Sequence, residues 1–145
     1  MKYLSVIKIF LAILIVVQIS GCGKDDPTPA EPTANEATEK LLTSKSWQVS
    51  EVKVDGVTSD LYPGLAITFG SKTFTATNGG KVWPASGTWS FVGDSGTKLL
   101  RNDGLDATIE SISATQLIIL FNWSSTTFTK GRAGSLKGSH RMTFR

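Results

Sequence analysis

From Ser46 onward, short stretches of the chain carry an apolar side chain at every second residue. A period of two is that of a β-strand with one buried face, whereas an α-helix has a period near 3.6. The stretches are rich in β-branched and aromatic residues and are separated by glycine and asparagine. This pattern predicts eight strands, near residues 46–55, 64–70, 72–78, 81–92, 97–101, 105–113, 116–124 and 135–145.

The turns between these stretches decide the topology. They are short and contain residues that accept a positive φ, namely Asp55-Gly56, Asn78-Gly79-Gly80, Gly93-Asp94-Ser95-Gly96 and Asp103-Gly104. Connections of this length make sequence neighbours antiparallel neighbours in space, because a parallel crossover needs a much longer segment. We therefore expect an all-β domain, an eight-stranded antiparallel up-and-down barrel whose closure removes the sheet edges.

The first predicted strand changes phase along its length. Trp47 and Val49 lie on one face, but Val52 and Val54 are out of phase with them. One extra residue near Ser50 or Glu51 restores a single inward face, which predicts a β-bulge there.

A short helix is expected before the first strand. Thr33-Ala34-Asn35-Glu36 matches a capping box, and the helix would run through Leu41 and Leu42. So short a helix is marginal by itself and must dock on the domain. The stretch 117–121 is apolar on both faces of its strand, so we expect the helix to cover the outer one.

An apolar, uncharged run at residues 9–19 follows Lys2 and Lys8. It is too short to cross a bilayer, which needs ~20 residues, and is typical of a signal peptide. The run ends in Ile19-Ser20-Gly21-Cys22, which resembles the lipobox of bacterial lipoproteins. The resemblance implies cleavage before Cys22 and a lipid on its thiol; the alternative is an ordinary signal peptide with a chance cysteine. The expected domains are a signal peptide (1–21), a lipidated cysteine with a flexible tether (22–34) and the barrel (35–145).

Lys24, Asp25 and Asp26 follow the cysteine directly. A lysine with two acidic residues at this place resembles the surface-export signal of Bacteroidota lipoproteins. It implies an outer-membrane protein that is lipid-anchored at the cell surface; the alternatives are a plain soluble start of the tether and a position on the periplasmic face. Residues 27–34 are rich in proline, threonine and alanine and cannot bury enough surface to fold.

The order of motifs over most of residues 41–145 resembles the lipocalin-like lipoproteins of Bacteroidota, which are small calycin-type barrels. The resembling segments are Leu41-Leu42, Trp47, Asp55-Gly56, Ile67-Thr68-Phe69, Gly87-Thr88-Trp89-Ser90-Phe91, Asp106-Ala107-Thr108-Ile109, residues 117–121 and residues 138–144. The resemblance implies that the first and last strands meet, with Arg141 or Arg145 stacked on Trp47. Lys45-Ser46-Trp47 departs from the Gly-x-Trp that lipocalins favour.

The composition excludes several classes of function. The 15 basic residues include Lys2 and Lys8, so 13 remain after cleavage against 12 acidic residues, and no nucleic-acid affinity is expected. Cys22 is the only cysteine and His140 the only histidine, so neither an internal disulfide nor a zinc cluster is predicted. We find no nucleophile with a base and no carboxylate pair, and we expect a protein that is not an enzyme and carries no metal or cofactor.

His140 shares one face of the last strand with Leu136, Met142 and Phe144, so its side chain should point inward. The leading hypothesis is a non-enzymatic, membrane-anchored binding lipoprotein. Trp89, Phe91 and Phe121 would hold a small apolar or amphipathic ligand, with His140 as a polar handle. The alternative is a cell-surface interaction protein with a filled barrel, which binds a protein or glycan or acts as an inhibitor and has a hydrogen-bonded core histidine. The interior volume of the barrel distinguishes the two hypotheses.

Overall fold

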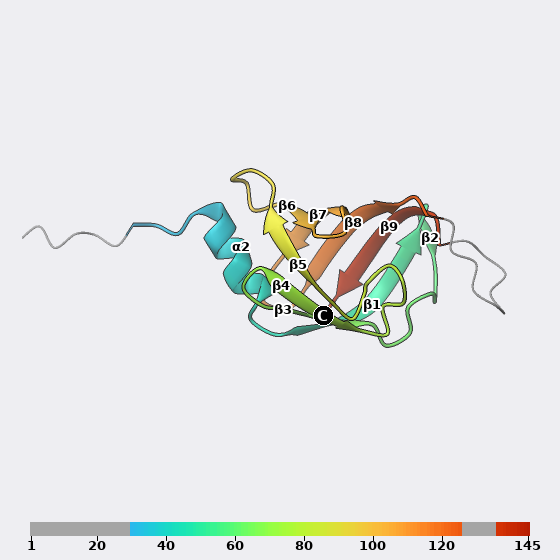
Figure 1. Ribbon diagram of the computed structural model, residues 1–145. Coiled ribbons are helices and arrows are strands. Elements are labelled where there is room, and N and C mark those ends of the chain that lie inside the picture. Colours follow the sequence, from blue (N-terminus) through green and yellow to red (C-terminus); the bar gives the residue numbers. More distant parts are fainter. Residues whose placement is uncertain (1–29, 126–135) are drawn as a thin grey trace, which may run out of the picture. The chain divides into compact units, whose positions relative to one another are not determined.

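The computed structural model describes residues 30–125 and 136–145, and shows a closed, eight-stranded antiparallel barrel with one extra strand and one short helix (Figure 1). The predicted all-β barrel is confirmed. The described elements are α2 (Ala34–Leu42), β1 (Ser46–Val54), β2 (Val57–Thr58), β3 (Ala66–Phe69), β4 (Thr73–Thr77), β5 (Ser86–Phe91), β6 (Lys98–Arg101), β7 (Asp106–Ile112), β8 (Leu117–Trp123) and β9 (Gly138–Phe144).

Each barrel strand pairs with its neighbour in sequence, in the order β1-β3-β4-β5-β6-β7-β8-β9. The barrel closes because β9 also pairs with β1, from Val49 opposite Phe144 to Val54 opposite His140. The extra strand β2 folds back on the end of β1 through the turn at Asp55-Gly56. Two residues are too few to show a period, which is why the sequence did not predict β2.

The predicted bulge in β1 is confirmed, because the pairing with β9 shifts between Val49 and Glu51. As a result Trp47 and Val52 both point inward and are 0% and 4% exposed. The bulge lies where β1 changes partners along its other edge. Its first residues pair with β3 and its last two with β2.

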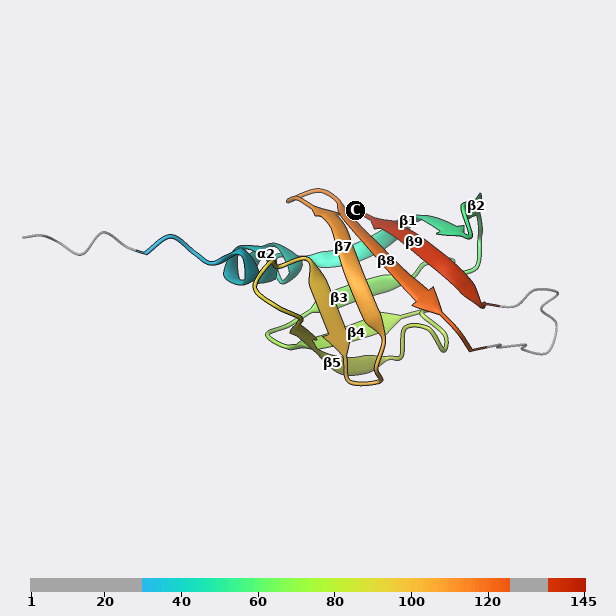
Figure 2. The same ribbon diagram turned by 90° about the horizontal axis from the view of Figure 1, so that it is seen from above.

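Helix α2 begins with the predicted capping box. The Thr33 hydroxyl accepts a hydrogen bond from Glu36 N at 3.2 Å, and the Glu36 carboxylate accepts one from Thr33 N at 2.8 Å. The backbone hydrogen bond from Thr33 is the main reason that the pKa of Glu36 is lowered. The helix lies at one end of the barrel (Figures 1 and 2), where Asn35 Nδ2 donates to Gly93 O at 3.0 Å.

The expectation that α2 covers the outer face of β8 is therefore wrong. Leu42 is its only buried residue, so the helix has too little apolar surface to cover a sheet. The link between α2 and β1 is also short, and Trp47 Nε1 donates to Leu42 O at 2.9 Å. This bond holds the end of the helix against the start of β1.

The strand predicted over 81–92 begins only at Ser86. Residues 79–85 form a loop instead, in which Trp83 N donates to Gly79 O at 3.0 Å. Pro84 has no N–H for a strand ladder, and a Cβ on Gly79 would lie 2.3 Å from Trp83 atoms, so only glycine fits there. The loop turns Val82 and Trp83 into the barrel, and we call residues 79–85 the plug loop.

Candidate functional site

A chain of side-chain rings crosses the interior of the barrel. The contacts run from Tyr62 to His140 (centroids 5.9 Å apart), to Phe121 (4.9 Å), to Trp83 (6.0 Å) and to Phe74 (5.7 Å). We call these five residues the ring core. Each is at most 5% exposed, so these side chains occupy the interior in contact with one another.

Arg101 brings a charge into this interior and is 3% exposed. Its guanidinium lies over the rings of Trp83 and Phe74, at 4.7 and 5.4 Å, and its Nη1 donates to Val82 O at 2.8 Å. It also forms an ion pair with Asp103. Burial acts to raise the pKa of Asp103, but the hydrogen bonds and charge of Arg101 outweigh it and lower that pKa. Arg101 thereby fastens the plug loop while its own charge is compensated.

His140 points inward, as predicted, and is fully buried. Its Nδ1 lies 3.1 Å from Gly138 O, and its Nε2 lies 3.1 Å from the Tyr62 hydroxyl. Burial lowers the pKa of His140, so the ring is neutral at pH 7. Since a carbonyl only accepts, Nδ1 carries the proton and Nε2 accepts from Tyr62. Both nitrogens are used within the protein, as in the core histidine of the alternative hypothesis.

The other predicted ligand residues, Trp89 and Phe91, lie in a separate cluster near α2. Trp89 contacts Phe69 and Phe91 edge to face, at 6.1 and 5.1 Å, and its Nε1 donates to Thr73 O at 2.9 Å. The Lys72 ammonium lies 4.7 Å from the Trp89 ring and pairs with Glu39 of α2 at 2.6 Å. The structure thus divides the four predicted ligand residues between two groups, Trp89 with Phe91 and Phe121 with His140.

Trp47 pairs with Ile67 of β3, two residues before the β1–β9 register that closes the barrel begins at Val49, and is fully buried. The cation over its ring is Lys45, at 4.6 Å, and the expected stacking of Arg141 or Arg145 is wrong. Arg145 exchanges two backbone hydrogen bonds with Gln48, so their side chains point to the same, outer face while that of Trp47 points inward. Arg141 Nε donates to Glu110 at 2.7 Å, on the outer face as well.

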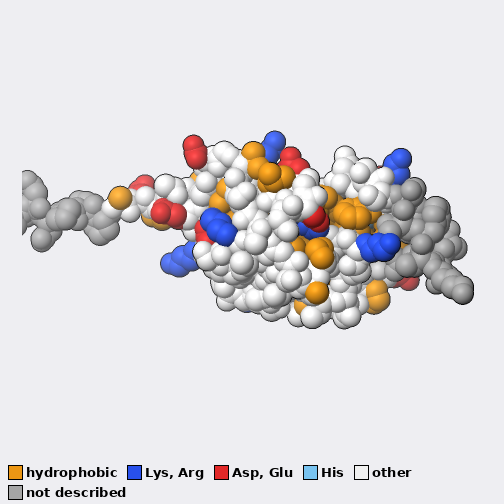
Figure 3. Space-filling model, in the orientation of Figure 1, with side chains coloured by type: hydrophobic (Ala, Val, Ile, Leu, Met, Phe, Trp, Pro, Cys, Tyr) orange, Lys and Arg blue, Asp and Glu red, His pale blue; other side chains and the backbone are white. Residues whose placement is uncertain are grey.

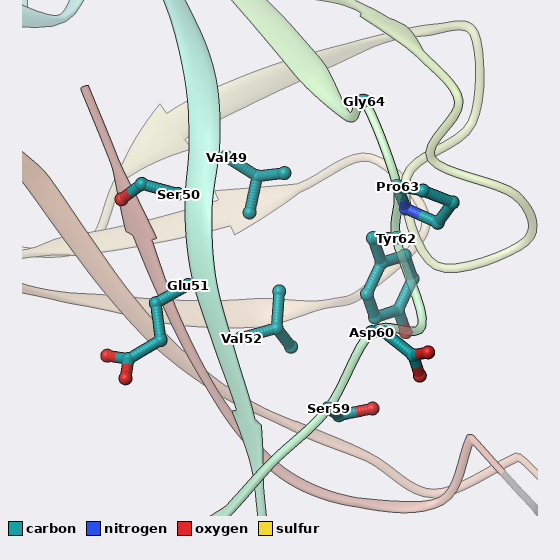
Figure 4. Close-up of a pocket in the computed structure, with 9 residues that line it drawn as sticks. All are labelled: Val49, Ser50, Glu51, Val52, Ser59, Asp60, Tyr62, Pro63 and Gly64. Carbon is teal, nitrogen blue, oxygen red and sulfur yellow. The ribbon is translucent and has the colours of Figure 1, made fainter.

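A cleft of about 240 Å³ opens between β1 and residues 59–64 (Figure 4). We call it the β1 cleft; it is lined by Val49, Ser50, Glu51, Val52, Ser59, Asp60, Tyr62, Pro63 and Gly64. Figure 4 shows the side chains of Val49 and Val52 directed toward the loop. Those of Ser50 and Glu51 point to the other side of the strand. The sequence analysis identified the bulge beside this cleft but not the cleft.

The two edges of the cleft are hydrogen bonds of β1. Val49 N donates to Leu65 O at 2.9 Å, and Ser59 N donates to Val52 O at 2.9 Å. Between them residues 60–64 leave the sheet, so β1 has no adjacent strand on this side. The cleft is thus a gap in the barrel wall, with Tyr62 of the ring core as part of its lining.

Elsewhere the outer surface is mixed in character. On the face in Figure 3, charged side chains of both signs are scattered, and apolar atoms form small separate patches. In residues 30–125 and 136–145 no helix is long and apolar enough to cross a membrane. The same residues contain no group of three histidine, cysteine or acidic side chains that could hold a metal ion.

Cys22, Lys24, Asp25 and Asp26 lie outside the described residues, so lipidation and export stay predictions. No protein-family model matches the chain, and no curated protein matches it significantly.

Proposed function

We propose that this chain is a non-enzymatic, lipid-anchored binding protein of the lipocalin-like kind, with a filled barrel that engages its partner from outside. The observation that carries the proposal is the ring core. It favours the interaction protein over the carrier of a small apolar ligand, because the side chains that would hold the ligand contact each other instead.

The size of the barrel supports this choice. Eight strands enclose an interior just wide enough for side chains to fill or for one small ligand. Buried aromatic side chains each remove about 150–250 Å² of surface from water, and the plug loop adds Trp83 to those that the strands supply. A drug-sized ligand usually needs a pocket of ~300–1,000 Å³, and the buried side chains occupy the interior in which such a pocket would lie.

Lipid on Cys22 would hold the protein on the outer membrane, and Lys24, Asp25 and Asp26 would direct it to the cell surface. The support is the sequence around the cysteine. Cys22→Ala should abolish membrane fractionation, and replacing all three export residues by alanine should protect the domain from protease added to whole cells. Wild-type protein that resists that protease would contradict surface exposure.

The filled barrel is tested by native mass spectrometry of the intact lipoprotein released from its membrane. We expect the mass of the lipidated chain alone, because the ring core leaves an apolar ligand no room. A bound apolar molecule that is retained in a Cys22→Ala protein would restore the small-ligand hypothesis. The same spectrum from a Trp83→Ala variant provides a control in which room has been made.

A further inference from the structure

We infer that Asn78 is a site of spontaneous deamidation and that the native fold slows the reaction there. Asn78 is the only asparagine of the chain that is followed by glycine. The other asparagines precede larger residues, in Asn35-Glu36, Asn102-Asp103 and Asn122-Trp123. This chemistry does not depend on which partner the protein binds, because it concerns the start of the plug loop alone.

The reaction needs only water. The backbone nitrogen of Gly79 attacks the side-chain carbonyl carbon of Asn78, and the amide nitrogen leaves as ammonia with the proton of the attacking nitrogen. The product is a five-membered succinimide ring. Water opens this ring at either of its two carbonyl carbons, which yields aspartate or isoaspartate. Glycine favours the attack, because it has no side chain to shield its nitrogen.

The packing of the plug loop explains why this pair is present. Asn78 has a φ of 57°, a left-handed conformation that asparagine adopts more readily than most residues. Gly79 is buried, and a Cβ on it would lie 2.3 Å from the Cβ and the carbonyl oxygen of Trp83. The turn that brings Trp83 into the barrel is therefore built from a pair of residues that is open to deamidation.

The native structure restrains both reacting groups. Asn78 Nδ2 donates to Gly64 O at 3.1 Å, so the side-chain amide is held on the loop 59–64. Gly79 O accepts from Trp83 N at 3.0 Å, which fixes the backbone on the other side of the attacking nitrogen. The side chain must leave Gly64 before its carbonyl carbon is free to turn onto that nitrogen. The reaction thus proceeds from local openings of the turn.

Deamidation removes the donor of the bond to Gly64. The oxygens of the new carboxylate only accept hydrogen bonds, so Gly64 O would face a negative charge in place of an N–H. Gly64 lines the β1 cleft, and Asn78 directly precedes the plug loop. The modification therefore breaks a link between the wall of the cleft and the loop that fills the barrel.

The test is peptide mapping by mass spectrometry of the detergent-solubilised lipoprotein after incubation at mildly alkaline pH. We expect Asn78 to deamidate at least about tenfold more slowly in native buffer than in urea that unfolds the domain. Asn35, Asn102 and Asn122 serve as internal controls and should react more slowly than Asn78 in urea. Equal rates for Asn78 in the two solutions would overturn the protection by the fold. Another asparagine that reacts as fast as Asn78 in urea would overturn the site.

Two aspartate variants test the structural consequence. Asn78→Asp supplies one product directly and should lower the urea midpoint of unfolding, because the donor to Gly64 is lost. Asn102→Asp is the matched control, since Asn102 Oδ1 accepts from Thr88 N at 3.1 Å and aspartate keeps an acceptor there. Its midpoint should fall less. A midpoint for Asn78→Asp equal to or above that of Asn102→Asp would overturn the link between the two loops.

Discussion

The ring core and the β1 cleft meet at one side chain and are opposite in character. Tyr62 donates a hydrogen bond from its hydroxyl to His140, while the residue also lines the β1 cleft. The ring core is built mainly from strands that keep their period of two, with Tyr62 and Trp83 added from loops. The cleft lies where that period breaks, at the bulge of β1 and the loop 59–64. In this molecule regular alternation fills the interior, and interruptions of it create the β1 cleft.

The largest loss of stability is expected from a substitution near the closure of the barrel. Trp47→Ala should lower the free energy of unfolding by ~3–5 kcal/mol, because it removes a fully buried indole. Arg145→Ala should change it by less than ~0.5 kcal/mol, because that exposed side chain does not support Trp47. Urea unfolding measures both. A loss in Arg145→Ala comparable with that in Trp47→Ala would mean that an arginine does support the closure.

A substitution of His140 tests how much its buried hydrogen bonds in the ring core contribute to stability. His140→Gln should cost about 1–3 kcal/mol at pH 7.5, because the buried hydroxyl of Tyr62 loses a well-placed acceptor. Burial lowers the pKa of folded His140 below its ordinary value of 6.5. Below pH 6.5 the unfolded chain therefore binds more protons than the folded one, and the stability of the wild type falls as the pH is lowered.

The substitution removes this dependence, so the difference between wild type and His140→Gln should narrow as the pH falls from 6.5 toward the lowered pKa. The chain has one histidine, so no other imidazole contributes. Urea titrations at a series of pH values follow the difference. A difference that stays constant over this range would show that the folded imidazole is not held neutral by burial.

The ion pair that holds α2 on the barrel should contribute less to stability than Trp47 or His140. Glu39→Gln removes its ion pair with Lys72, whose side chain is 51% exposed. Pairs so open to solvent contribute ~0–1 kcal/mol, and Lys72 keeps its contact with the Trp89 ring. Thermal unfolding should therefore detect a loss below about 1 kcal/mol, and a larger one would assign α2 a main part in holding the barrel closed.

An effect on stability as small as that of Arg145→Ala is expected in the cleft. Asp60→Asn should change the free energy of unfolding by less than ~0.5 kcal/mol, because the side chain is exposed and no described residue pairs with it. A marked destabilisation would instead give Asp60 a structural role.

The sequence predicted the parts that depend on alternation and turn chemistry. The antiparallel barrel, the bulge at Ser50, the capping box at Thr33 and the inward His140 are all confirmed. Residues 81–85 of the plug loop were predicted as strand, because Val82 and Trp83 are apolar and only the loop geometry reveals their role. Gly79-Gly80 at the start of the loop and Pro84 within it were the signals against a strand there.

The candidate site was less predictable than the fold. The contact between Lys45 and Trp47 depends on the residue at which β1 begins, and the alternation of apolar residues does not specify strand boundaries. The sequence analysis did not identify Arg101, because a sequence does not distinguish a buried arginine from an exposed one. Its partners Asp103 and Val82 are evident only in the structure. The β1 cleft depends on a loop that leaves the sheet, and no periodic pattern describes such a loop.

The central claim, that side chains fill the interior, is tested most directly by following the Met142 methyl group during addition of benzene. Met142 is fully buried, and the only other methionine is the first residue, so selective methyl labelling places one probe in the core. The account predicts no saturable shift in the wild type and a saturable shift in Trp83→Ala, since an engineered apolar cavity can bind benzene. A saturable shift in the wild type, at benzene concentrations that also saturate Trp83→Ala, would show that the barrel holds a ligand cavity and would contradict the account.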